Sequence, residues 1–252
     1  CEFQHIQAQD SSSLGIAERF KETRNRIEKI ALNSGRNPDS ISIIAVSKTK
    51  PVELVYKAIK VGITNFGENR LQEAEKKIPA IEKIFSRECS ESPKIIWHMI
   101  GRIQSNKTSK IARLFDVVHS IDNIKNARRI AQTAIELGKI IDVFIEVNTT
   151  DEEAKGGIAP ELLLDFAEEV CQMDGLRLRG LMTLGPHVED DAMIRRSFAN
   201  LRLQRDELKN NYSSDKFPGD LSMGMSGDYP IAIEEGSTHV RIGTALFGKR
   251  QV

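Results

Sequence analysis

Short apolar runs alternate with longer amphipathic stretches along most of the chain. The apolar runs have the length and β-branched content of buried strands, and the stretches between them show helical periodicity. The eight predicted strands cover residues 41–48, 63–68, 94–101, 116–121, 141–148, 176–184, 220–226 and 239–247. The predicted helices cover residues 14–33, 52–61, 69–85, 105–114, 123–138, 160–173, 189–210 and 229–235.

Alternation of strand and helix predicts a parallel sheet covered by helices. Eight such units behind one leading helix predict an α/β fold, a single closed (β/α)8 TIM barrel with an extra N-terminal helix. A doubly wound sheet would carry a glycine fingerprint after its first strand, where this chain has Lys48-Thr49-Lys50-Pro51. No linker marks a second domain, so residues 14–252 are assigned to the barrel. Residues 1–13 are predicted to be an N-terminal tail, either disordered or left from expression or from a trimmed leader.

Composition narrows the class of partner. The 252 residues suit one barrel, and Lys+Arg and Asp+Glu are both 36, which argues against nucleic acid or an anionic membrane as the main partner. The chain contains no run of eighteen apolar residues, so the sequence predicts no transmembrane helix. The three cysteines and five histidines show no metal-ligand spacing, and the cysteines show no disulfide pattern. We therefore expect no metal and a reducing, cytoplasmic compartment, with an organelle left open.

Lys48 is the first candidate for chemistry, since it ends the apolar run 41–48. In barrels of this kind, reactive groups gather at the carboxyl ends of the strands. A partly desolvated lysine there is a nucleophile for aldehydes. The plain alternative is a lysine that extends from the strand end into water.

The ends of the last two predicted strands indicate a phosphate site. Ser226 leads through Gly227-Asp228 into a helix, and Gly243-Thr244 adds a backbone approach and a second hydroxyl. Loops after strands seven and eight are the usual phosphate site of barrels. The alternative is a helix cap at Ser226 and close packing at Gly243.

Three further residues are candidates for the rest of a ligand. Arg241 lies two residues before Gly243, on the same side of the strand, where it can bond a ring nitrogen or form a buried salt bridge. His98, next to Trp97, can stack on a planar ring or be a satisfied core histidine. Asn69 can bond a ligand substituent or cap the following helix.

Six ordered segments resemble one known family, the pyridoxal phosphate homeostasis proteins, and the resemblance runs from about residue 14 to residue 250. The segments are Ala45–Pro51, Phe66–Asn69 with Gln72-Glu73, Trp97–Lys107, Gly180–Thr183, Leu221–Ser226 and Gly236–Gly248.

This resemblance implies a barrel of the alanine racemase N-terminal type that binds pyridoxal 5′-phosphate (PLP). It implies that Lys48 holds the cofactor as a Schiff base and that Arg241 faces the pyridine nitrogen. Ser226, Gly243 and Thr244 would hold the phosphate, and His98 and Asn69 would line the ring.

The resemblance favours a non-catalytic carrier that serves intracellular vitamin B6 homeostasis, with PLP-dependent apoenzymes as possible recipients and a monomeric state. The alternative is a racemase-type enzyme, which needs a second base opposite the lysine. Among the three tyrosines, only Tyr229 follows a strand near the mouth of the predicted barrel. A Schiff-base aldolase without cofactor fits Lys48 but explains Arg241 and His98 less well.

Overall fold

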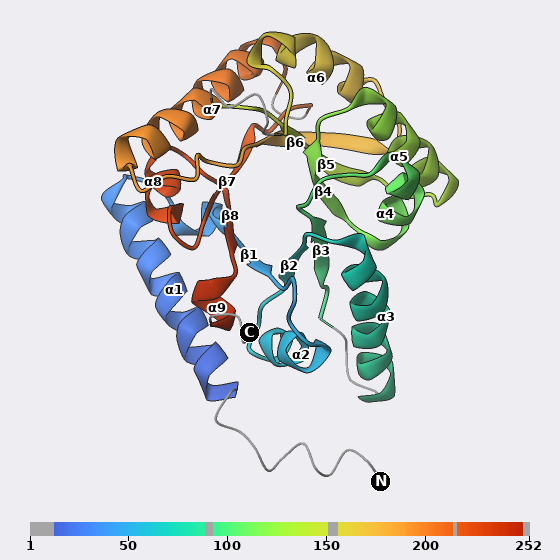
Figure 1. Ribbon diagram of the computed structural model, residues 1–252, viewed down its shortest axis with the longest axis vertical. Coiled ribbons are helices and arrows are strands. Elements are labelled where there is room, and N and C mark those ends of the chain that lie inside the picture. The colour runs from blue at the N-terminus through green and yellow to red at the C-terminus, as the bar shows by residue number, and fades with distance from the viewer. Residues whose placement is uncertain (1–12, 89–92, 151–155, 214–215, 249–252) are drawn as a thin grey trace.

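In the computed structural model, residues 13–88, 93–150, 156–213 and 216–248 are described. Within them, eight parallel strands close into a barrel in chain order, so β8 pairs with β1 (Figure 1). The strands are β1 Ser42–Val46, β2 Asn65–Glu68, β3 Ile96–Met99, β4 Val117–Ile121, β5 Ile141–Glu146, β6 Leu176–Met182, β7 Asp220–Met225 and β8 His239–Ile242. The predicted barrel is confirmed.

Helices surround the strands as an outer ring (Figure 1). The α-helices are α1 Ser13–Asn33, α2 Val52–Lys60, α3 Leu71–Glu88, α4 Thr108–Leu114, α5 Ile124–Glu136, α6 Leu163–Cys171, α7 Asp191–Asn211, α8 Tyr229–Glu234 and α9 Thr244–Phe247. Short 3-10 helices cover Pro38–Ser40, Ser105–Lys107 and Pro160–Leu162. Helix α1 begins at Ser13, one residue before the predicted start, and the rest of the predicted tail lies outside the described residues.

Burial on both faces explains the apolar runs. All five residues of β4 are buried, because one face points into the barrel and the other packs under helices. The leading helix α1 packs against α8 and α9 (Figure 1). There Arg19 Nε donates to Leu246 O at 2.7 Å, and Arg36 Nη1 donates to Ile233 O at 2.7 Å. The first bond fastens α1 to α9, and the second fastens the segment that follows α1 to α8.

The predicted strand over 239–247 is too long. Strand β8 ends at Ile242, and Thr244–Phe247 form helix α9. The amides of Leu246 and Phe247 donate to Gly243 O at 3.1 and 2.9 Å, which are helical bonds rather than ladder bonds. An apolar run of this length does not distinguish a strand from a short buried helix. The change matters because it turns the amino end of α9 toward the carboxyl edge of the barrel.

Candidate functional site

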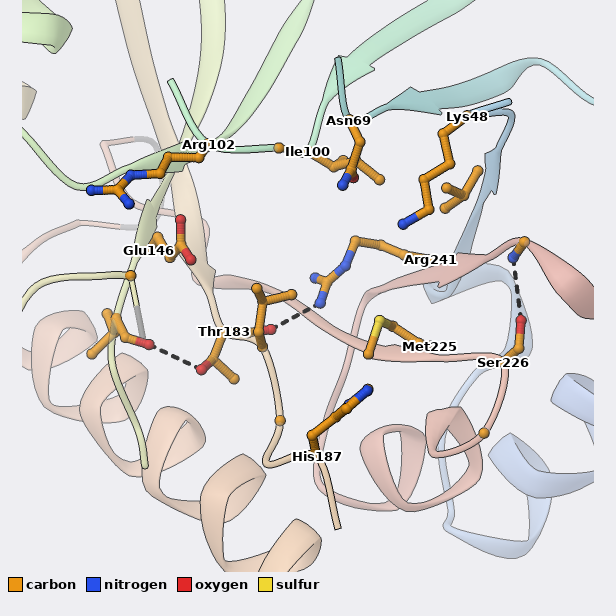
Figure 2. Close-up of a pocket in the computed structure, with 18 of the residues that line it drawn as sticks. Lys48, Asn69, Ile100, Arg102, Glu146, Thr183, His187, Met225, Ser226 and Arg241 are labelled. Carbon is orange, nitrogen blue, oxygen red and sulfur yellow. Dashed lines mark hydrogen bonds between the residues drawn. The ribbon is translucent and has the colours of Figure 1, made fainter. Parts of the chain in front are cut away.

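A cavity of about 580 Å³ opens at the carboxyl ends of the strands (Figure 2). Its volume is in the range of small-molecule and cofactor pockets. Segments that follow each of the eight strands contribute to it. The lining includes Lys48, Asn69, Arg102, Asp122, Glu146, Asn148, Thr183, His187, Ser226, Gly227, Arg241, Gly243 and Thr244. Most of the residues singled out in the sequence therefore meet in one place.

Lys48 lies in a tight turn directly after β1. The amide of Lys50 donates to Ser47 O at 3.0 Å, which closes a four-residue turn with Lys48 in its second position. The Lys48 side chain is half-buried and projects into the cavity, toward the space that Arg241 also faces (Figure 2). The turn thus aims the amine inward, and the lysine does not extend into bulk water.

Arg241 is buried on β8, with 4% of its surface exposed. Its Nη1 donates to Ser222 O at 2.7 Å and to Ser222 Oγ at 2.8 Å, and its Nη2 donates to Thr183 O at 2.8 Å (Figure 2). Among the described residues no carboxylate lies within ion-pair distance, so the buried salt bridge is not observed. Burial lowers the pKa of Arg241 to about 10, against the opposing effect of Asp228 and Glu146, so the guanidinium stays charged at neutral pH.

Ser226 connects the loop after β7 to the amino end of α9. Its Oγ accepts hydrogen bonds from the amides of Gly243 at 3.2 Å and Ala245 at 3.4 Å. The N-cap of α8 is Asp228, so Ser226 does not cap that helix. A Cβ on Gly243 would meet Val46 at an ordinary 3.6 Å, so close packing does not require the glycine. Both structural alternatives for these residues are thus disfavoured.

Asn69 follows β2, and its side chain faces the cavity (Figure 2). Gly101, which follows β3, lies against the backbone of Asn69. A Cβ on Gly101 would lie only 2.1 Å from Asn69 O. Only a glycine permits this approach. The contact between the two strand ends fixes where Asn69 stands.

His98 does not line the cavity; it lies inside the barrel with 2% of its surface exposed. Its Nδ1 is 2.9 Å from His119 Nε2, and its Nε2 is 3.0 Å from Asn65 Oδ1. His119 Nδ1 is in turn 2.8 Å from Ser222 Oγ. The structure therefore gives His98 the surroundings of a satisfied core histidine, in a polar chain that ends on Arg241.

The chemistry of the donors and acceptors fixes the direction of each hydrogen bond in this series from Asn65 to Arg241. Asn65 Nδ2 donates to Thr64 Oγ1, so Asn65 Oδ1 accepts from His98 Nε2–H. Neutral His98 then accepts at Nδ1 from His119 Nε2–H, and His119 accepts at Nδ1 from the Ser222 hydroxyl. Ser222 Oγ accepts from Arg241, which can only donate. Both histidines are therefore neutral Nε2–H tautomers that support the arginine.

Buried neutral histidines make the fold sensitive to acid. Burial lowers the pKa of His98 to about 3 and that of His239 to about 4, and it lowers the pKa of His119 well below its ordinary value. In the unfolded chain each would titrate near ~6.5. Their stabilisation is thus complete above ~6.5 and is lost as pH falls toward the folded pKa values, because the unfolded chain takes up protons first.

We expect urea unfolding at pH 7.5, 6.5 and 5.5 to show this loss. Near pH 5.5 the unfolded chain binds three histidine protons that the folded protein does not bind. The folded protein binds one proton on Glu146 that the unfolded chain does not bind, so the unfolded chain carries two more protons in all. The free energy of unfolding should fall by at most about 3 kcal/mol per pH unit there. The raised pKa values of Glu68 and Asp122 reduce the slope. A free energy that rises from pH 6.5 to 5.5 would contradict the neutral histidines.

Three charged residues of the cavity were not predicted from the sequence. Asp122 follows β4. Glu146 ends β5 and is 7% exposed, and Arg102 follows β3; Figure 2 shows these last two side chains. Burial, followed by Asp122, raises the pKa of Glu146 to about 7, against the opposing effect of Arg241 and Arg102. Asp122 and Arg102 come just after predicted strands, which was the available signal for them, because the barrel brings all such positions to one edge. Glu146 lies inside the predicted strand 141–148 and carried no such signal.

Tyr229 lies away from the cavity. It is 3% exposed at the start of α8, and the Arg26 guanidinium of α1 lies 5.5 Å from its ring centroid. Tyr229 follows β7 as predicted, but its side chain packs against α1 and does not line the cavity. Within the described ranges, none of the helices has the length and apolar character of a membrane span, and no three His, Cys, Asp or Glu side chains are grouped so that they could hold a metal ion.

Comparison with known proteins agrees with this geometry. Residues 21–251 match the family described as alanine racemase, N-terminal domain. The pyridoxal phosphate homeostasis protein of Pseudomonas aeruginosa is 43% identical over 235 residues, which cover 93% of this chain and 96% of that protein. The chain belongs to the pyridoxal phosphate homeostasis protein family.

Two solved structures of similar chains share the barrel. A protein titled as unknown from Bifidobacterium adolescentis has a TM-score of 0.87 at 35% identity, over 95% of this chain and 97% of that one. PipY of Synechococcus elongatus, solved with PLP bound, has a TM-score of 0.79 at 33% identity, over 92% of this chain and 100% of that one. In this family the cavity at the barrel mouth is the natural candidate for the cofactor.

Proposed function

We propose that this protein binds PLP, with Lys48 as the Schiff-base lysine, and holds the cofactor for vitamin B6 homeostasis. The observation that carries the proposal is the convergence of the Lys48 amine, the Arg241 guanidinium and the Ser226 loop on one cavity (Figure 2). The binding of PLP by PipY, a protein of the same fold and 33% identity, supports it.

The residues present fit the chemistry of the group. A phosphate monoester dianion needs several donors, and the mouth offers the Ser226 and Thr244 hydroxyls. A Cβ on Gly227 would meet nothing within 4 Å, so the loop leaves room there. An aldehyde needs a nucleophilic amine, and Lys48 is the lysine among the described lining residues.

Each residue has a distinct task in this proposal. Lys48 provides the amine that condenses with the aldehyde, and Ser226, Gly243 and Thr244 hold the phosphate. Asn69 bonds a ring substituent from the side of β2. Bound PLP would supply a reactive aldehyde and an electron-accepting ring. The charged Arg241 disfavours a proton on a ring nitrogen placed beside it, which weakens that electron sink.

A carrier is favoured over a racemase-type enzyme. Racemisation needs a second base across the substrate from the lysine, and the tyrosine considered for that task, Tyr229, is buried against α1. His98 supports Arg241 through His119 and Ser222 and does not line the cavity. We further propose a monomer in the cytoplasm that passes the cofactor to PLP-dependent apoenzymes.

Discrimination between PLP and pyridoxal tests the phosphate site. The wild-type protein should bind PLP far more tightly, and Ser226→Ala should weaken PLP binding by about 10- to 100-fold, the effect of one charge-assisted hydrogen bond. Binding of pyridoxal, which lacks the phosphate, should change little. Absorbance titration of the apo-protein measures both constants. Ser86→Ala, which removes an exposed hydroxyl of α3, is the matched control. If Ser226→Ala weakened the binding of PLP and of pyridoxal equally, the assignment of Ser226 to the phosphate would be contradicted.

A further inference from the structure

A buried ion pair lies behind the turn that carries Lys48. Lys77 of α3 is 5% exposed and Glu68 of β2 is fully buried, and their Nζ and Oε1 atoms are 2.5 Å apart. Neither residue lines the cavity. Buried pairs of this kind contribute little net stability compared with apolar residues of the same size. Stability alone therefore does not explain why the chain has an ammonium and a carboxylate here.

Both partners of the pair hold Ser47, the residue before Lys48. Lys77 Nζ donates to Ser47 O at 2.7 Å, and Ser47 Oγ donates to Glu68 Oε1 at 2.7 Å. Ser47 itself is fully buried. The carbonyl that Lys77 holds is also the acceptor that closes the turn to the amide of Lys50. The pair thus fixes the first residue of the turn through its backbone and its side chain.

The same turn contains a residue in an unfavourable conformation. Thr49 has φ of 63°, and among the described residues it is the one non-glycine with positive φ. It occupies the third position of the Ser47–Lys50 turn, where glycine or asparagine is usual. A β-branched residue persists there only when its surroundings impose the conformation. Glu73 of α3 contributes, since its Oε2 accepts from the Thr49 amide at 2.6 Å.

We propose that the Glu68–Lys77 pair, assisted by Glu73, is a positioning device that holds the Ser47–Lys50 turn so that the Lys48 amine points into the cavity. The proposal deepens the function given above and rests on it. Without the pair, Thr49 relaxes toward negative φ and the turn opens. The Lys48 amine then no longer points into the cavity, while the phosphate loops, which follow β7 and β8, are unaffected.

The experiment compares two ligands on one double variant. Lys77→Met with Glu68→Met replaces the pair by apolar side chains of similar length and leaves no charge buried. Pyridoxine 5′-phosphate, which has the phosphate but no aldehyde, should bind within about twofold of wild type. PLP should bind at least about tenfold more weakly, because a small displacement of a reacting group has effects of this size. Hydrogen exchange at the Thr49 and Lys50 amides of the apo-protein should become faster.

A rescue separates positioning from a merely structural role. Thr49→Gly accepts positive φ without strain, so adding it to the double variant should restore much of the PLP affinity. Lys110→Met, which breaks the exposed pair between Lys110 and Glu75 of α3, should leave both ligands and the exchange rates unchanged. Glu73→Gln, at a half-buried position, gives a second test that does not disturb the core: PLP affinity alone should fall.

Two outcomes are distinguishable. If the double variant and Glu73→Gln bind PLP like wild type, with unchanged exchange in the turn, the positioning role is wrong and the proposed function stands. If the wild-type protein binds no PLP, the proposed function is wrong, and faster exchange in the double variant would still show that the pair holds the turn.

Discussion

Lys48→Ala should abolish the visible absorbance that the wild-type protein develops with PLP, and it should weaken PLP binding by at least about tenfold. The reason is that Lys48 provides the amine at the cavity wall, in a turn that directs it inward (Figure 2). Noncovalent contacts to the phosphate and ring remain, so binding weakens without vanishing. Absorbance and fluorescence titrations of the two proteins measure both effects.

The control for Lys48→Ala is a ligand that cannot condense. Pyridoxine 5′-phosphate should bind the variant and the wild type equally, which shows that the cavity is intact. Lys125→Ala removes an amine from the exposed surface of α5 and should change neither absorbance nor affinity. If Lys48→Ala retained the wild-type spectrum, another amine would be the nucleophile and the assignment would fail.

Arg241→Met should destabilise the apo-protein by about 2–5 kcal/mol. The side chain donates to the carbonyls of Thr183 and Ser222 in the barrel interior, and buried acceptors that lose their donor cost about 1–3 kcal/mol each. Methionine fills similar space without donating. The variant should also alter the spectrum of bound PLP, because the charge beside the ring nitrogen is gone. Urea unfolding of the ligand-free protein measures the first effect.

Arg179→Met provides the matched comparison. Arg179 pairs with Asp220 at 2.8 Å across β6 and β7, but its side chain is 33% exposed. Exposed pairs contribute about 0–1 kcal/mol, so this variant should be nearly as stable as wild type. If Arg241→Met were equally mild, the guanidinium would not be the structural centre of the polar chain through the barrel.

The fold followed from the sequence because its signal repeats. Eight strand–helix units each carry the same pattern, and an error in one boundary does not change the closed barrel. The failure came at residues 239–247, where one apolar run contains β8 and then α9. A short apolar run with a glycine in the middle does not show at which residue the strand ends and the helix begins.

The sequence predicts the site only in part. The position of a residue on a strand shows which end of the barrel it lies at, but not how deeply its side chain is buried. Lys48 and Asn69 follow their strands and reach the cavity, whereas His98 lies within β3 and pairs with Asn65, the first residue of β2. Glu146 is the last residue of β5 and lies inside the predicted strand 141–148, so its position in the sequence does not mark it as a residue of the cavity. Its pKa is raised first by burial and then by Asp122, and both effects depend on the packing of β5 beside β4 in the folded barrel.

The pair behind Lys48 was also beyond sequence reasoning. Lys77 lies three residues after Ala74 and four before Ile81, on the apolar face of α3, but this spacing does not show whether its ammonium is buried or extends to the solvent. Its partner Glu68 lies nine positions earlier, at the end of a strand, so no helical pairing rule joins them. Only the packing of α3 against β2 brings the two charges together under the turn.

Borohydride reduction followed by peptide mapping tests the central claim most directly. The wild-type protein is incubated with PLP, reduced, digested and examined by mass spectrometry for a lysine that carries the pyridoxyl phosphate group. We expect stoichiometric modification of the peptide that contains Lys48. Modification spread over several surface lysines, or none at Lys48, would contradict it.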